Sequence, residues 1–268
     1  MLYLVTYWAK MHKKLSFTNG RWDTLVWILH DPIWNQTTKP PVMLLCHGFG
    51  SDKDRITYLT LETLLAERWI AVFRFDFYGH GESEGDISDI TISEGIDDAI
   101  HAYDLLLEQW YTKIWLFGSS FGWCVALHIA AKLNEKLEIL VCKAPVSDYQ
   151  QKYDTQMWAE WIAERKARWR RPYVGRTGET FQINYSMYED ELKYCDYKVY
   201  THISIPTLIV HWWHDMGVPV EQSYKTAKLI PDCTLKVIDT ADHGFTWVWE
   251  AEQAYAYFLE FITKHLVE

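Results

Sequence analysis

The sequence predicts an α/β protein with a mostly parallel central sheet that helices cover on both faces. Short apolar runs alternate with longer amphipathic segments along most of the chain, and one segment rich in aromatic and charged residues interrupts this alternation. Strands that alternate with helices are typical of a parallel sheet. The chain has 268 residues, which is enough for one large domain or for a core with an insertion. We therefore expect a core formed by residues 1–147 and 205–268, with residues 148–204 inserted between its two parts.

The first part of the core is expected to start with a hairpin and to continue with alternating strands and helices. Asn19-Gly20 favours a tight turn between two strand-like segments. Thr91 or Ser93 can cap a helix whose first turn contains Glu94. In chain order, the patterns predict strands at 15–18, 24–30 and 42–46, a helix at about 56–68, a strand at 70–75, a helix at 93–110, a strand at 114–117 and a helix at 123–130.

The second part of the core contains the remaining strands. We expect strands at 137–142, 207–211 and 235–238 and a closing amphipathic helix at about 250–265. The segment from Asp148 to Ser204 has helical spacing near residues 157–168. We interpret it as a helical lid inserted between two core strands.

A Gly-x-Ser-x-Gly motif, Gly118 to Gly122, lies between the strand at 114–117 and the helix at 123–130. In this setting it has the form of a nucleophile elbow, because its two glycines permit a tight turn that exposes the Ser120 hydroxyl above the sheet. The N-terminus of the following helix would stabilise a negative charge that develops there. The alternative is a surface loop with an uninvolved serine.

Ser120 needs a base and a third group that orients the base. Catalytic groups of an open α/β sheet gather at the carboxyl ends of its strands. Asp215 follows the strand at 207–211, and His243 follows the strand at 235–238. The chain order Ser120, Asp215, His243 is the order expected for a triad on such a sheet.

Other histidines and carboxylates have alternative interpretations. His47 and His80 lie in glycine turns and are better explained as residues that stabilise those turns. His211 is interpreted as a strand-end side chain packed in the core, and Asp242 as a solvated turn residue. The run from His211 to Asp215 could be taken for a metal site, but no further His or carboxylate cluster completes it. An ordinary loop carboxylate remains the alternative for Asp215.

An oxyanion intermediate needs two preorganised donors. One is expected to be the backbone N–H of Phe121, directly after the nucleophile. The other is expected in the loop 47–50 that follows the strand at 42–46, at the backbone N–H of Phe49.

Taken together, these motifs resemble the α/β-hydrolase superfamily and, within it, small bacterial esterases of the cinnamoyl/feruloyl-esterase and serine-aminopeptidase-like groups. The resemblance implies an α/β-hydrolase fold in which Ser120 is the nucleophile, His243 the base and Asp215 the residue that orients it, with Phe49 and Phe121 forming the oxyanion hole. It covers the core from about residue 40 to 250, and it is more specific for the superfamily than for the substrate. The residues that carry it are 47–50, 74–83, 118–122, 215–219 and 242–245.

Tryptophan stands at several positions where the resemblance would place glycine. The chain has 15 Trp, several times the usual share, whereas 13 Gly in 268 residues fall below the usual share of about 7%. One explanation is drift with aromatic infill. The hypothesis that we prefer is that a codon read as glycine by the source organism has been written as tryptophan. The positions are Trp69, Trp115, Trp123 and Trp212, and Trp22 and Trp27 look similar.

Composition limits the partners and the compartment. A formal charge of −10 and a pI near 5.5 argue against nucleic acid or an anionic membrane as a partner. The five cysteines are dispersed and lack Cys-x-x-Cys spacing, which favours a reducing compartment. The apolar residues 1–9 lack a basic region and a cleavage site, and Met11 is an alternative start. We expect a soluble, cytoplasmic protein that uses no cofactor and no metal; the oligomeric state stays open.

We expect a serine hydrolase that cleaves small-molecule carboxylic esters through an acyl-enzyme on Ser120. A peptide or amide, a monoacylglycerol and a thioester are the alternative substrates. The alternative of another class is a hydrolase fold that binds without catalysis, against which the set of Ser120, Asp215 and His243 argues. The aromatic lid favours acyl or aryl esters of modest size.

Overall fold

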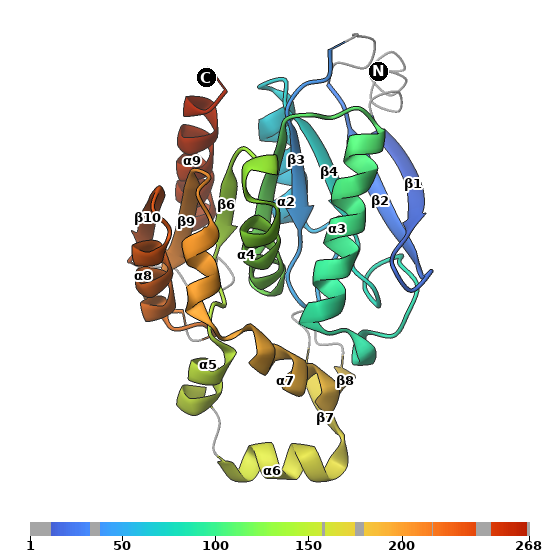
Figure 1. Cartoon of the computed structure of the whole chain (residues 1–268), viewed down its shortest axis with the longest axis vertical. Helices are drawn as coiled ribbons and strands as arrows, with labels where there is room; N and C mark the ends of the chain where they lie inside the picture. Colours follow the sequence, from blue (N-terminus) through green and yellow to red (C-terminus); the bar gives the residue numbers. More distant parts are fainter. Residues whose placement is uncertain are drawn as a thin grey trace.

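An eight-stranded sheet forms the centre of the computed structural model, which describes residues 12–32, 38–156, 159–174, 180–215, 217–239 and 248–266 (Figure 1). The strand order is β1-β2-β4-β3-β5-β6-β9-β10. Only β2 runs antiparallel to its neighbours, and the other paired strands are parallel, so the predicted sheet type is confirmed. The strands are β1 His12–Thr18, β2 Thr24–His30, β3 Val42–Cys46, β4 Ala71–Phe75, β5 Ile114–Ser119, β6 Leu140–Lys143, β9 Thr207–Trp212 and β10 Cys233–Ile238.

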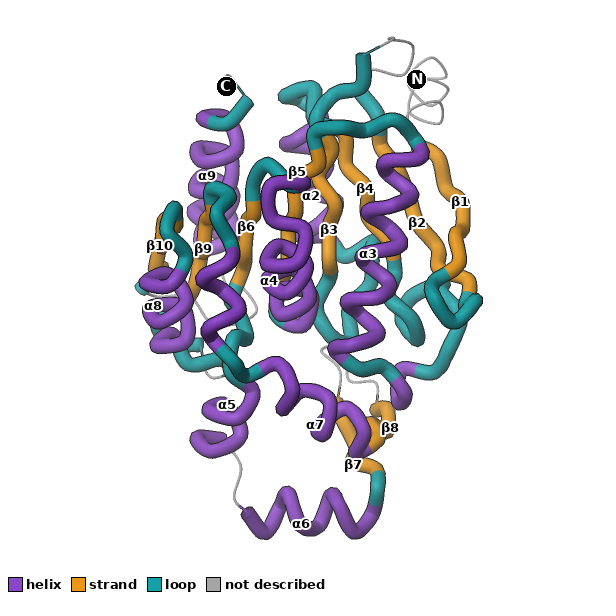
Figure 2. The backbone as a smooth tube through the Cα atoms, viewed as in Figure 1, coloured by secondary structure: helices purple, strands orange, loops and turns teal. Residues whose placement is uncertain are grey.

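Helices cover both faces of the sheet because the apolar side chains of the buried strands point alternately to the two faces (Figure 2). In β3, Leu44 and Cys46 pack in the cluster that contains the apolar side of α3 and α4, whereas Met43 and Leu45 pack with α2 and α9. The helices of the core are α2 Ile56–Ala66, α3 Ile92–Glu108, α4 Phe121–Leu133, α8 Val220–Leu229 and α9 Val248–Lys264. The sequence prediction missed α8, and the other four match predicted helices.

The insertion between β6 and β9 differs from the expected helical lid. Its helices are α5 Tyr149–Gln156, α6 Ala159–Arg168 and α7 Tyr185–Glu191. It also contains an antiparallel pair of strands, β7 Arg170–Val174 and β8 Thr180–Asn184, which the prediction of a helical insertion did not include. Figure 1 shows α6 and the strand pair projecting from one end of the sheet.

Hydrogen bonds hold both ends of this insertion on the core. At its start, the Gln222 side-chain oxygen accepts the backbone N–H groups of Ser147 (2.8 Å) and Asp148 (3.1 Å). At its end, Asp190 of α7 accepts the backbone N–H of Ser93 (2.8 Å) and its hydroxyl (2.7 Å) in the first turn of α3. The Thr91 hydroxyl accepts the Glu94 N–H and caps the same helix. Of the two predicted caps, Thr91 and Ser93, Thr91 is therefore the one that the structure shows.

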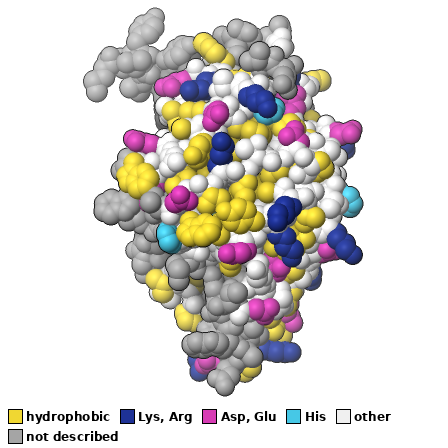
Figure 3. All heavy atoms as spheres, turned by 90° about the vertical axis from the view of Figure 1, so that its left-hand side faces the viewer, with side chains coloured by type: hydrophobic (Ala, Val, Ile, Leu, Met, Phe, Trp, Pro, Cys, Tyr) yellow, Lys and Arg dark blue, Asp and Glu magenta, His cyan; other side chains and the backbone are white. Residues whose placement is uncertain are grey.

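The face of the molecule on the side of β10, α8 and α9 mixes acidic, basic and apolar side chains without an extended patch of one charge in its described part (Figure 3). None of the helices within the described ranges is both long and apolar enough to cross a membrane. All five cysteines are free thiols, and three of them are buried.

Candidate active site

Ser120 occupies a sharp turn between β5 and α4. Its backbone has φ 54° and ψ −113°, a conformation that is costly for a residue with a side chain and that is typical of functional turns. Both motif glycines stand where no side chain fits: a Cβ on Gly118 would lie 2.7 Å from the Trp123 Cα, and a Cβ on Gly122 would lie 2.3 Å from the Cys46 carbonyl oxygen. The predicted strand–turn–helix context of Ser120 is therefore confirmed.

The loop after β3 lies directly against Ser120. A Cβ built on Gly48 would be 3.5 Å from the Ser120 Cβ. The rings of Phe49 and Phe121 are in edge contact, with centroids 6.2 Å apart. The Gly48 N–H donates a hydrogen bond to the Tyr58 hydroxyl oxygen (3.1 Å). The two residues expected to supply oxyanion donors thus lie side by side next to Ser120, while the role of their N–H groups stays a prediction.

His47 and His80 stabilise turns, as predicted. His47 accepts the Phe77 N–H through Nε2 (3.1 Å), so its Nδ1–H donates to the Gly48 carbonyl (2.8 Å). His80 accepts the Gly50 N–H through Nε2 (3.2 Å) and donates from Nδ1 to the Tyr78 carbonyl (2.9 Å). Burial lowers the pKa of His47 to about 4 and that of His80 to about 3, so both rings are neutral at pH 7.

Behind this loop lies a buried ion-pair cluster that sequence reasoning did not single out as functional. Asp76, fully buried after β4, accepts the Lys53 N–H (2.6 Å), the Lys53 ammonium (2.8 Å) and the Glu82 N–H (2.9 Å). Burial alone would lower the pKa of Lys53, but its hydrogen bonds to Asp76 and Glu82 raise that pKa above its ordinary value. The cluster ties the loop after β3 to the loop after β4.

Asp215 lies just past β9, with no exposed side-chain surface. One of its carboxylate oxygens accepts the backbone N–H groups of Gly217 and Val218, each at 2.8 Å, and such bonds favour the ionised carboxylate. The other oxygen lies 3.2 Å from Nε2 of His211, whose Nδ1 is 2.5 Å from the Ser223 hydroxyl. His211 is buried, as predicted. Its contact with Asp215 was missed, because a spacing of four residues brings side chains together on a helix and carries no such signal at the end of a strand.

His243 and Asp242 lie outside the described residues. The structure brings Ser120 and the loop of Asp215 to one cavity, and the position of His243 in that set remains a prediction. No group of three or more His, Cys, Asp or Glu side chains that could hold a metal ion occurs among the residues that the structure describes.

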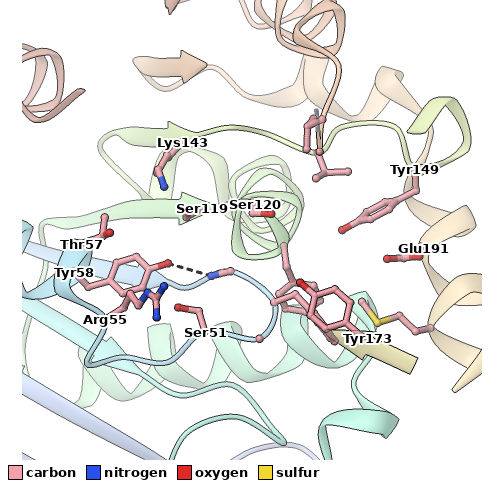
Figure 4. A pocket seen from close by; sticks show the side chains of 18 of the residues that line it. Ser51, Arg55, Thr57, Tyr58, Ser119, Ser120, Lys143, Tyr149, Tyr173 and Glu191 are labelled. Atoms are coloured by element: carbon pink, nitrogen blue, oxygen red, sulfur yellow. Dashed lines mark hydrogen bonds between the residues drawn. The ribbon is translucent and has the colours of Figure 1, made fainter. Parts of the chain in front are cut away.

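A cavity of about 350 Å³ opens over Ser120, between the carboxyl ends of the strands and the insertion. Figure 4 shows two groups of side chains on opposite sides of the serine. Polar and basic groups form one side and aromatic groups with one carboxylate form the other. The first group is Arg55, Thr57, Tyr58 and Lys143, and the second is Tyr149, Tyr173 and Glu191, beside which Tyr153 also lines the cavity.

Most of these lining residues were not predicted individually. Lys143 ends β6, and its ammonium lies 5.4 Å from the centre of the Trp212 ring. The buried Tyr153 hydroxyl donates to Glu191, which joins α5 to α7. The signal available for Lys143 was its position at the carboxyl end of a strand, where site residues gather. The Tyr153–Glu191 contact depends on how the insertion folds.

Comparison with known proteins agrees with this geometry. The family model described as Serine aminopeptidase, S33 matches residues 38–197. Palmitoyl-protein thioesterase ABHD10, mitochondrial, of Mus musculus is 26% identical over 209 residues, which cover 76% of this chain and 69% of the relative.

Two solved structures illustrate the shared fold. Est1E of Butyrivibrio proteoclasticus with bound ferulic acid superposes with a TM-score of 0.78 at 21% identity, covering 93% of this chain and 99% of that chain. An esterase of Pyrococcus furiosus gives a TM-score of 0.70 at 18% identity, covering 95% of this chain and 91% of that chain. At these identities the solved structures establish the fold alone. With more than half of its length matched by the family model, the chain belongs to the serine aminopeptidase S33 family and is a hydrolase of the α/β-hydrolase superfamily.

Proposed function

We propose that the protein hydrolyses carboxylic esters through an acyl-enzyme on Ser120, with His243 as the base and Asp215 as the group that orients it. The observation that carries this proposal is the strained backbone of Ser120 at a strand–helix junction that opens into a cavity. A strained serine that faces a cavity at a strand–helix junction favours a functional role over that of an uninvolved surface serine.

In the proposed reaction, the Ser120 hydroxyl attacks the ester carbonyl carbon while His243 takes its proton. The backbone N–H groups of Phe49 and Phe121 stabilise the negative oxygen, and His243 then gives the proton to the departing alcohol. A water molecule repeats the sequence on the acyl-enzyme, which releases the acid and restores the serine. Asp215, held by two backbone donors, stabilises the imidazolium that forms in each half of the cycle.

The cavity supports an acyl group of modest size. Its volume of about 350 Å³ is at the small end of the range of about 300–1,000 Å³ that is usual for ligand sites. Tyr149, Tyr153 and Tyr173 border one side, where they can contact an aromatic or short aliphatic acyl group. Est1E, named above with ferulic acid, is consistent with this choice, whereas a long acyl chain, as in the named activity of the mouse relative, would need more space.

The opposite side of the cavity favours a negatively charged substituent on the substrate. Arg55 lines it, and the carboxylate next to it in sequence, Asp54, pairs with Lys53 and Arg74 instead. Within the described ranges, Arg55 itself makes no ion pair. The ammonium of Lys143 lies on the same side of Ser120 (Figure 4). A carboxylate on the substrate would pair with the Arg55 guanidinium.

Covalent labelling tests the catalytic proposal. A fluorophosphonate probe should label the wild-type chain and Ser119→Ala, but not Ser120→Ala, and Ser120→Ala should lose ester hydrolysis while keeping its circular dichroism spectrum. Undiminished ester hydrolysis by Ser120→Ala would reject the assignment. Labelled protein without turnover of any ester, amide or thioester would favour a binding role instead.

A substrate panel then tests the specificity. We expect 4-nitrophenyl esters with short or aromatic acyl groups to be cleaved with higher kcat/KM than the palmitate, an anilide or an acyl-thioester. The pair 4-nitrophenyl hydrogen succinate and 4-nitrophenyl methyl succinate differ in one charge. Arg55→Gln should raise KM for the charged member alone, and an equal effect on both would remove the proposed role of Arg55.

A further inference from the structure

Four tryptophans adopt left-handed backbone conformations that favour glycine. Their φ angles are 71° at Trp22, 61° at Trp69, 68° at Trp110 and 59° at Trp169. In this region the Cβ of an L-residue crowds its own carbonyl group, whereas glycine enters it freely. In the described part of the chain, only Ser120, Asn134 and Ala144 share a positive φ among the other non-glycine residues.

Two of these tryptophans follow helices in the hydrogen-bond pattern that ends a helix at glycine. After α2, the Trp69 N–H donates to the Ala66 carbonyl (3.0 Å) and the next N–H, of Ile70, donates to Leu65 (3.2 Å). This pair of bonds is a Schellman motif, and Trp69 stands at the position that glycine usually occupies.

The end of α3 repeats the same pattern. The Trp110 N–H donates to the Leu107 carbonyl (2.9 Å), and the Tyr111 N–H donates to the Leu106 carbonyl (3.1 Å). Trp169 directly follows α6. Three helices of the structure therefore end at a tryptophan in a left-handed conformation.

Trp22 is in the turn between β1 and β2. Its N–H donates to the Asn19 carbonyl (3.0 Å), and the Asn19 N–H donates to Asp23 (3.1 Å). A hairpin turn that closes through a residue in the left-handed region usually has glycine at that residue.

Packing does not offset the strain at these positions. The exposed fractions of Trp22, Trp69, Trp110 and Trp169 are 83%, 63%, 82% and 61%. Their indole rings thus gain little burial to balance the unfavourable backbone.

A fifth tryptophan, Trp123, stands inside the protein at a position that also suits glycine. It is fully buried in the first turn of α4, where the helix backbone lies against β5 behind Ser120. Its indole N–H has no acceptor among the described residues, which is costly for a buried donor.

We infer that the natural protein carries glycine at positions 22, 69, 110, 123 and 169, because its source reads as glycine a codon that stands as tryptophan in this sequence. The excess of Trp (15) over Gly (13) in the chain follows directly from such a reading. The inference concerns the fold and does not depend on the proposed reaction.

Peptide mass spectrometry of the protein isolated from its source tests this directly. Peptides that contain positions 22, 69 and 110 should be lighter by the mass difference between a Trp and a Gly residue at each position. Peptides that contain tryptophan at these positions would overturn the inference.

Stability measurements on the full recombinant chain give a second, independent readout. Trp69→Gly and Trp110→Gly should each raise Tm by about 2–4 °C, the shift that corresponds to relief of one left-handed residue in a chain of this size. Trp69→Ala and Trp110→Ala should not, because alanine meets the same backbone strain. The control Trp249→Gly, in the first turn of α9, should leave Tm unchanged or lower. Equal effects of Gly and Ala at positions 69 and 110 would show that these backbones do not require glycine.

Discussion

Gly122→Ala is expected to disable the site by moving α4 away from the loop after β3. The new Cβ would lie 2.3 Å from the Cys46 carbonyl oxygen and 2.4 Å from that of His47. Ordinary contacts between such atoms begin near about 3.5 Å, so α4 and the loop must separate by roughly 1 Å. The three atoms nearest the new Cβ all belong to the backbone, so no flexible side chain can yield instead.

This separation acts on the two elements that carry Ser120 and Phe49. Misplacement by roughly 1 Å costs on the order of 100-fold in rate, so we expect kcat for ester hydrolysis to fall by about that factor. Overpacking also destabilises the chain, by about 1–3 kcal/mol. KM should change less than kcat, because the cavity residues on the insertion, such as Tyr149 and Tyr153, stay in place.

The assay is steady-state hydrolysis of a 4-nitrophenyl ester, with urea unfolding on the same samples. Gly95→Ala is the matched control, because the atoms nearest its Cβ would be side-chain ends of Val125 and Phe121, at 2.8 Å and 2.9 Å, rather than backbone. We expect this control to keep kcat within a few-fold of wild type. A folded Gly122→Ala variant with wild-type kcat would refute the claim that close approach of α4 and the loop aligns the site.

Three further variants test other parts of the structure. Burial lowers the pKa of His80 to about 3. The unfolded chain therefore takes up this proton as pH falls below 6.5 while the folded chain does not, and stability is lost toward acid pH. His80→Gln should make the slope of the unfolding free energy between pH 6 and 4, measured with urea, shallower by about 1.4 kcal/mol per pH unit, and an unchanged slope would contradict the neutral buried ring. Lys53→Met leaves the Asp76 charge buried without its ammonium and should cost about 3–5 kcal/mol of unfolding free energy, whereas a wild-type urea midpoint would mean that Asp76 does not need it. His211→Phe removes a hydrogen-bond partner of Asp215 and should lower kcat about 10- to 100-fold at unchanged KM, and full activity would assign His211 a packing role only.

Local patterns made most of the core predictable. The apolar run at 42–46 matches β3 residue for residue, because a strand buried on both faces reads as a continuous apolar segment. Gly118 and Gly122 predicted the turn around Ser120, since neighbouring backbone lies too close to both positions to admit a side chain. The positions of Asp215 and Phe49 followed from the rule that loops at the carboxyl ends of strands meet.

Other features depend on contacts between distant parts of the chain. Helix α8 was missed, and its buried Gln222 bonds to residues 147 and 148 rather than packing in an apolar stripe. In the strand pair, β7 contains Pro172 and no regular alternation, so periodicity gave no signal for it. In β8, Thr180–Asn184, polar and apolar residues alternate, a period-two signal that the sequence prediction did not use. Arg55 precedes α2 without any motif, and only the assembled cavity gives it a role.

The two anchors of the insertion make it a separable module. Gln222 fixes the chain where it leaves β6, and Asp190 fixes it where it returns over the first turn of α3. Neither anchor belongs to the turn that carries Ser120. Chimeras that replace residues 149–189, the segment between these anchors, with that of a related hydrolase should therefore exchange substrate preference while the catalytic framework stays intact, because this segment carries Tyr149, Tyr153 and Tyr173 of the cavity.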